Sequence, residues 1–355
     1  FFTPSAKEVI GDEYYVIDYY RLYSRIKFST EIVEATRAVD KLKLPEDMIG
    51  IHLRAGDIIY GMHKNNPIFI SKVLEFPFVL HILEVENHSK VILIGQDQDF
   101  IETIKYTYQV KSSDDFYYEN ITSLQKIFFD IQLFVKCKKV YGADSGPILL
   151  ANSISKRALI NPHQDLEDDE KLRILRKWLL KKDAINSSIP DLQIAYACFA
   201  YISYGFNDEK KEDLVAVNNV AREKNKANRL YDIFDLFLRY GFLENEEAEK
   251  NVLEYITMHG TTQFPVKGYD ILFRNGLGTT RLNHNLQYTK KLKSIIQNAT
   301  DKLPYANLLL GLACYYTDAY IEAGLYFRKY IEEERVFQVP DVVRAFFEGN
   351  KISII

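Results

Sequence analysis

A histidine, an arginine and an aspartate lie close together at the end of an apolar run. The run is Ile49–Ile51, and His52, Arg54 and Asp57 follow it within six residues. An arginine guanidinium always carries its charge and can hold a phosphate through two parallel hydrogen bonds. Gly56 allows the close backbone approach that an anion needs. These residue types predict a phosphate site at the end of a strand, although an internal arginine–aspartate pair beside a buried histidine would use the same residues.

A second candidate follows the apolar run VILIG. Asp97 lies two residues after that run, where it could contact the ribose or base of a nucleotide or cap the next helix. Asp97 and Asp99 also have the spacing of a DxD metal motif, but such short motifs match by chance. We therefore predict no metal ion. The cysteines lie far apart without CxxC spacing, which is typical of reduced thiols in a cytoplasmic chain; they are Cys137, Cys198 and Cys314.

A third candidate follows the run KVYGA. Asp144, Ser145 and Gly146 come directly after it, and Pro147 suits the first position of a helix. Backbone amides at a helix N-terminus bind phosphate. We therefore expect the amides of residues 145–148 and the Ser145 hydroxyl to help hold an anion.

The overall composition excludes several classes of protein. A formal net charge of −4 and a pI near 6.1 argue against a nucleic-acid-binding protein, which needs a basic face. No apolar run approaches the roughly 18 residues of a membrane span, and no signal peptide is visible. We therefore expect a cytoplasmic protein, and its 355 residues suffice for two ordinary domains.

Alternating strand and helix patterns must position the three candidates. The pattern runs from about residue 30 to 162 and predicts a Rossmann-like parallel sheet with helices on both faces. Ligands of such sheets bind at the carboxyl ends of the strands, and all three polar groups follow expected strands. Pro77 should bend or break the helix that contains it. The expected strands are 49–53, 90–95, 138–143 and 157–161, and the expected helices are 30–44, 69–85, 99–106, 123–137 and 147–155.

The second half of the chain shows only helical patterns. We place the boundary between a nucleotide-sugar-binding domain at 1–164 and an α-helical domain at 165–355. Gly311, Ala323 and Phe327 have the spacing of a tetratricopeptide (TPR) unit, so the helical domain is predicted to be TPR-like, although one unit does not make an array. The expected helices are 165–182, 191–204, 208–224, 226–241, 244–258, 286–298, 303–317 and 319–334, with a loop or irregular hairpin at 259–285.

Two spaced motifs in the first half resemble a known family. HxRxGD directly after a strand is similar to the donor-site motif of the GT-B fucosyltransferase superfamily, the α1,2-, α1,6- and protein O-fucosyltransferases. The α1,2 branch continues with Asp-x-x-Leu and a cysteine on a helix, then a strand and a serine-containing turn. The resemblance covers roughly residues 30–162, and the residues that carry its second motif are Asp130, Leu133, Cys137, Asp144 and Ser145.

The resemblance implies an inverting, metal-independent glycosyltransferase. It would transfer a sugar from a GDP-sugar, with no other cofactor, to a glycan acceptor during synthesis of a bacterial surface polysaccharide or glycoconjugate. Arg54 would stabilise the leaving diphosphate. No general base for the acceptor hydroxyl is obvious; Asp57 and His63 are the nearby candidates, and an exposed loop histidine is the other interpretation of His63. The remaining donor-site residues that the resemblance implies are His52, Gly56, Asp97, Asp144, Ser145 and Gly146.

The chain also departs from the family pattern. Ala55 stands where a second arginine is common, and DSGPILL replaces a Ser-Thr-Phe-Ser-Trp-Trp run, so the sugar stays open between fucose and another GDP-linked deoxyhexose or heptose. A GT-B enzyme has two Rossmann-like domains, and only about fifty residues precede the motif, too few for a domain of the usual size. We expect a truncated or reduced acceptor half, or acceptor binding by the helical domain.

Other interpretations stay open at this stage. Segment 171–182 places basic residues around Leu, Ile and Trp178, which suits a packed linking helix or a helix at the inner membrane surface. The helical half also suits a protein partner. The chain as a whole could be a helical-repeat interaction protein with a degenerate, non-catalytic nucleotide-sugar fold, or another phosphoryl or phosphosugar enzyme with the same anion site.

Overall fold

The computed structural model describes most of the chain. The described residues are 19–61, 72–155, 157–180, 188–205, 210–228, 230–240, 245–259, 293–294, 297, 303–316, 319–332 and 339–349. Contacts divide the chain into two compact units. The sheet unit comprises Phe1–Ala55, Lys72–Leu74 and Val79–Leu166, and the helical unit comprises Gly56–Ser71, Glu75–Phe78 and Glu167–Ile355.

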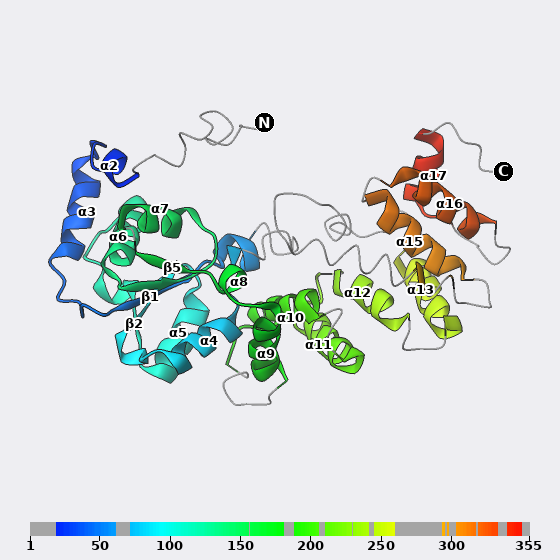
Figure 1. The fold of residues 1–355 in the computed structure, drawn as a ribbon, viewed down its shortest axis with the longest axis horizontal. Helices are drawn as coiled ribbons and strands as arrows, with labels where there is room; N and C mark the ends of the chain where they lie inside the picture. The colour runs from blue at the N-terminus through cyan, green and yellow to red at the C-terminus, as the bar shows by residue number, and fades with distance from the viewer. Residues whose placement is uncertain are drawn as a thin grey trace. The chain divides into compact units, whose positions relative to one another are not determined.

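The first unit is built on a five-stranded sheet whose strands all run parallel (Figure 1). The strand order is β3-β2-β1-β4-β5. The chain therefore builds outward from β1 on one side, then returns to place β4 on its other side. In open parallel sheets ligands bind at the carboxyl ends of the strands where this reversal occurs, which here lies between β1 and β4. The strands are β1 (Ile49–Leu53), β2 (Val91–Gly95), β3 (Lys111–Ser112), β4 (Lys139–Tyr141) and β5 (Ala158–Ile160).

The reversal of direction also distributes the helices over the two faces. Parallel crossovers are right-handed, so helices that follow the outward and the return path cover opposite faces, as Figure 1 shows for α4 and α5 against α6 and α7. Helices α3 and α6 pack together, and so do α6 and α7. The helices of this part are α2 (Tyr19–Tyr23), α3 (Thr30–Asp40), α4 (Phe76–Val85), α5 (Gln98–Tyr108), α6 (Ser123–Lys136), α7 (Gly146–Ser155) and α8 (Pro162–Asp165).

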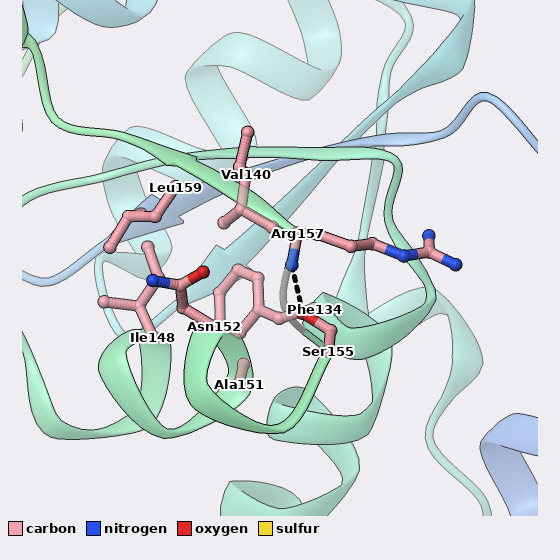
Figure 2. Close-up of a pocket in the computed structure, with 9 residues that line it drawn as sticks. Phe134, Val140, Ile148, Ala151, Asn152, Ser155, Arg157 and Leu159 are labelled. Atoms are coloured by element: carbon pink, nitrogen blue, oxygen red, sulfur yellow. Dashed lines mark hydrogen bonds between the residues drawn. The ribbon is translucent and has the colours of Figure 1, made fainter. Parts of the chain in front are cut away.

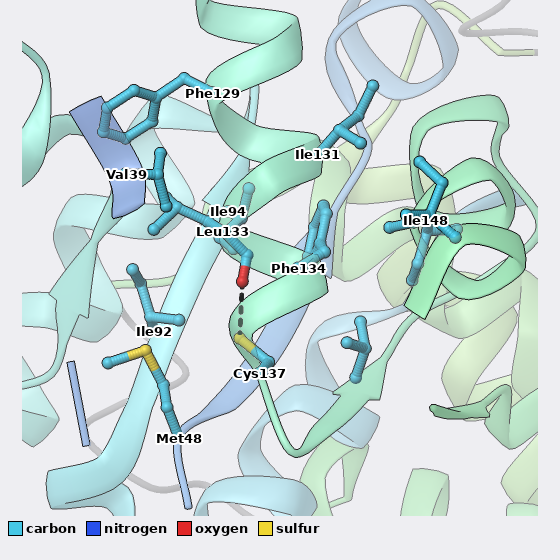
Figure 3. Packing of buried hydrophobic residues seen from close by; sticks show 13 residues of the cluster. Val39, Met48, Ile92, Ile94, Phe129, Ile131, Leu133, Phe134, Cys137 and Ile148 are labelled. Atoms are coloured by element: carbon cyan, nitrogen blue, oxygen red, sulfur yellow. Dashed lines mark hydrogen bonds between the residues drawn. The ribbon is translucent and has the colours of Figure 1, made fainter. Parts of the chain in front are cut away.

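The core on the α6 face joins these helices to the sheet (Figure 3). Ile92 and Ile94 of β2 lie among apolar residues of α3, α6 and α7, because alternate residues of a strand point to the same face. The Cys137 thiol lies in this cluster and donates to the carbonyl of Leu133, at 3.2 Å. A Cβ added at Gly50 would lie 3.1 Å from the Cys137 Sγ. Gly50 therefore lets β1 approach the end of α6 closely.

The regular elements described in the second unit are helices. In the α15–α16 hairpin the rings of Phe327 and Tyr330 are fully buried, as is the methyl group of Ala323. A Cβ added at Gly311 would lie 2.5 Å from the Phe327 ring, so this glycine sets the close approach of the two helices. The helices are α9 (Asp168–Leu179), α10 (Asp191–Gly205), α11 (Lys211–Lys224), α12 (Leu230–Arg239), α13 (Asn245–His259), α15 (Pro304–Tyr316), α16 (Tyr320–Ile331) and α17 (Asp341–Gly349).

The basic segment 171–182 forms most of α9. Leu172, Ile174, Leu175 and Trp178 are buried, with Trp178 at 6% exposure, and α9 packs on α10; Leu180, just after the helix, is 40% exposed. This burial favours the packed linking helix over a helix whose apolar face enters a membrane surface. Within the described ranges, no helix combines the length and the apolar character that crossing a membrane requires.

The α/β first half and helical second half are confirmed, and several details differ. The expected helix 69–85 is broken at Pro77 and not bent there: α4 begins at Phe76, residues 73–75 before it are not helical, and Pro77 is its second residue, where the missing N–H costs nothing. The N-cap of α6 is Thr122, because Thr122 and Gln125 form a reciprocal capping box. Strand β3 and helix α17 were not predicted. The expected loop or hairpin at 259–285 lies outside the described residues, except for His259, which ends α13. The expected helix 286–298 also lies outside them, except for residues 293–294 and 297.

Candidate functional site

His52 and Ser145 bring the first and third candidates together. His52 lies near the end of β1 and is 7% exposed, and its Nδ1 lies 3.3 Å from the Ser145 hydroxyl. The imidazole packs edge-on against Phe134, with ring centroids 5.5 Å apart. Burial, and next the charge of Arg54, lower the pKa of His52 to about 4. His52 is therefore neutral at physiological pH and offers one N–H and one acceptor nitrogen.

Gly142 makes this contact possible. A Cβ at Gly142 would lie 2.5 Å from the Ile148 Cδ1 and 2.9 Å from the His52 Cβ. The loop after β4 can therefore lie against β1 only if this position carries no side chain. The backbone N–H of Gly142 also donates to the Ile160 carbonyl of β5, at 3.1 Å.

The rest of the first motif follows β1 directly. Arg54 is partly buried, and its charge acts on His52. Gly56 and Asp57 open a short π-helix, η2 (Gly56–Tyr60), whose Ile58 and Ile59 are buried. π-Helices are rare and frequently lie at functional sites.

His63, the alternative base, lies outside the described residues. Asp57 is therefore the predicted base that the structure describes. It stands in the first turn of η2 and is partly exposed.

The loop after β4 places Asp144, Ser145 and Gly146 at the carboxyl edge of the sheet. Ser145 is 3% exposed, and its carbonyl accepts the Leu149 N–H of the first turn of α7, at 3.0 Å. A Cβ at Gly146 would meet nothing within 4 Å, so the space over the start of α7 is open. The expected run of amides at 145–148 is shorter by one, because Pro147 has no N–H.

Asp97 is the N-cap of α5. Its side chain is 1% exposed and accepts the Phe100 backbone N–H, at 3.3 Å. Of the two interpretations that the sequence left open, the structure shows the cap. Gly95 before it lets β2 turn tightly, because a Cβ there would lie 2.0 Å from the Leu53 carbonyl oxygen.

The hydrogen-bonded group that Asp130 forms with Tyr117 and Ser113 was not predicted. Asp130, on α6, accepts a hydrogen bond from the Tyr117 hydroxyl at 2.8 Å, and Ser113 lies 3.2 Å from that hydroxyl. Burial raises the pKa of Asp130 to about 7, although the hydrogen bonds from Tyr117 and Ser113 oppose this shift. Ser113 follows β3, which has only two residues, so no periodic pattern pointed to it.

One small pocket borders the buried side of this region (Figure 2). Phe134, Ile148 and Leu159 line it, together with Arg157 near the start of β5. Arg157 donates to the carbonyls of Lys136 and Cys137, at 2.9 and 2.7 Å, and so caps the end of α6. The pocket has room for about one water molecule, so it is no substrate site.

Comparisons with known proteins add no further assignment. The chain matches no family model, no curated protein and no solved structure. Across the described part of the chain, no three histidine, cysteine or acidic side chains gather as metal ligands would. The polar edge of β1 and β4 is therefore the feature from which function must be argued.

Proposed function

We propose that the protein is a glycosyltransferase that transfers a sugar from a GDP-sugar to a glycan acceptor, by an inverting and metal-independent displacement. The observation that carries the proposal is the 3.3 Å contact between His52 and Ser145, 93 residues apart in the chain. The two motifs that resemble the GT-B fucosyltransferases therefore meet at the reversal point of a parallel sheet, where nucleotides are bound in doubly wound folds. We propose, as part of the same function, that the sheet unit is a Rossmann-like nucleotide-sugar-binding domain.

The chemistry assigns a role to each group. The acceptor hydroxyl attacks the anomeric carbon, the bond from that carbon to the diphosphate breaks, and the hydroxyl proton passes to a base. Arg54 and the open start of α7 at Gly146 stabilise the charge that develops on the leaving diphosphate. His52 is neutral and contributes a hydrogen bond without charge. Asp57 is the proposed base.

A thermal-shift screen with GDP, UDP, CMP and their sugars tests the proposal. A ligand that binds only the folded protein stabilises it by about 2.7 kcal/mol at a hundred times its Kd, so GDP and its sugars should raise the melting temperature. Arg54→Ala should abolish that rise. Arg37→Ala is the matched control, because Arg37 is an exposed residue of α3 in the same unit. Absence of any nucleotide response in the wild-type protein would refute the proposal.

A non-catalytic interaction protein is the second candidate. His52 and Ser145 are buried and contact each other at 3.3 Å, as residues with a purely structural role would, and Pro147 removes one potential phosphate donor. This candidate predicts no release of GDP from any GDP-sugar, even where GDP binds.

A further inference from the structure

Asp144 lies beside the proposed phosphate region but is turned toward β5. Its neighbour Ser145 contacts His52 of β1, whereas the Asp144 carboxylate contacts Asn161 and Gln164, which follow β5. The loop after β4 thus presents a hydroxyl on one side and a carboxylate on the other. A ligand whose diphosphate lies near Arg54 and Gly146 would meet Asp144 with a different part of its structure.

Two amides hold this carboxylate in one orientation. The Asn161 amide donates to Oδ1 at 3.0 Å and the Gln164 amide to Oδ2 at 2.8 Å. Asn161 is 3% exposed, its side-chain oxygen accepts the His163 N–H at 3.1 Å, and its own N–H donates to Asp165 at 2.6 Å. The Asn161 side chain therefore cannot turn away, so Asp144 is oriented before a ligand arrives.

The chemistry of a carboxylate limits what it can bind. An ionised carboxylate has about four acceptor positions and no donor, and the two amides occupy one on each oxygen. Asp144 is partly exposed, so about two positions stay open to a ligand. A phosphate would be repelled, because like charges are disfavoured at short range. Neighbouring hydroxyls on a sugar supply two donors at a matching spacing.

We propose that Asp144 binds a vicinal diol of the substrate, and that Asn161 and Gln164 are positioning residues for it. The diol belongs to the nucleotide ribose or to the transferred sugar. This inference rests on the proposed function and changes one part of it, because Asp144 recognises hydroxyl groups and takes no part in holding the diphosphate.

Isothermal titration of Asp144→Asn with four ligands tests the inference. The ligands are pyrophosphate, GDP, 2′,3′-dideoxy-GDP and whichever of GDP-fucose and GDP-mannose binds the wild-type protein more tightly. The variant should bind the diol-bearing ligand about tenfold more weakly and pyrophosphate equally or more tightly. If the ribose is the source, GDP loses affinity and dideoxy-GDP does not. If the transferred sugar is the source, only the GDP-sugar loses affinity.

Gln164→Met separates positioning from folding. Gln164 is exposed, so the variant should fold normally, lose severalfold in affinity for the same diol-bearing ligand and keep its pyrophosphate affinity. Asp169→Asn, at an exposed position of α9, is the charge-matched control and should change nothing. Equal losses for pyrophosphate and diol-bearing ligands in Asp144→Asn, or no loss for either, would overturn the inference alone. A wild-type protein that binds neither GDP nor a GDP-sugar would overturn the proposed function, and this inference with it.

Discussion

Asp130 should make the stability of the sheet unit depend on pH across the neutral range. Its carboxyl is largely removed from water on α6, and burial raises its pKa from an ordinary 3.8 to about 7. In the unfolded chain the ordinary value returns. Because the folded state binds this proton more tightly, the contribution to stability is complete below pH 3.8 and is lost as the pH rises through 7.

The magnitude follows from the two values. A difference of about three pH units, at about 1.4 kcal/mol each, gives about 4 kcal/mol between acidic and alkaline solution. Asp130→Asn replaces the protonated acid with a neutral group of the same shape. Its amide oxygen can still accept from the Tyr117 hydroxyl, and its NH₂ group can donate to Ser113. The variant should therefore keep the neutral contacts and lose this pH dependence.

Urea denaturation followed by far-ultraviolet circular dichroism, at intervals from pH 4 to 8.5, measures the effect. The free energy of unfolding of Asp130→Asn relative to wild type should rise steadily between pH 4 and 7, and the variant should be the more stable protein at pH 8. Asp169→Asn, an exposed acid of the helical unit, serves as control and should give a constant difference. A constant difference for Asp130→Asn as well would show that the carboxyl is ionised throughout this range, and would refute the reasoning.

Three further predictions concern glycines. Gly311→Ala should destabilise the helical unit by about 1–3 kcal/mol, because its Cβ would lie 2.5 Å from the Phe327 ring. Gly324→Ala is the comparison: its Cβ would lie 3.5 Å from Phe346, so it should stabilise α16 by about 0.5–1 kcal/mol. Equal changes in the free energy of unfolding of the two variants would contradict the close packing of Gly311 against Phe327. Gly142→Ala should lower the melting temperature and abolish GDP binding, because its Cβ would lie against His52 and Ile148; normal binding in a stable variant would exclude this role. Gly146→Ala should fold normally, since the space there is open, yet bind GDP about tenfold more weakly; titration showing unchanged affinity would place the diphosphate elsewhere.

The elements that local pattern determines were predictable from the sequence. Strand β2 is an unbroken apolar run and β1 is apolar except for His52, as expected of strands buried on both faces. Helices α6 and α9 carry apolar stripes at helical spacing. Strand β3 has only two residues, too few for any periodicity to appear. The start of α4 was placed too early, because a proline inside a helical pattern can either bend the helix or mark the first turn of a new one.

The candidate site was predicted in part from the sequence and in part only from the tertiary structure. The residue types of His52, Arg54 and Ser145 were enough to predict an anion site, and the alternating pattern was enough to place it at the carboxyl edge of a sheet. Only the tertiary structure decided that Asp97 is a cap, that His52 is neutral, and that Asn161 and Gln164 orient Asp144. Those outcomes depend on strand order and on burial, which arise from contacts between residues far apart in the chain, and no local spacing encodes which of two polar groups will face the other.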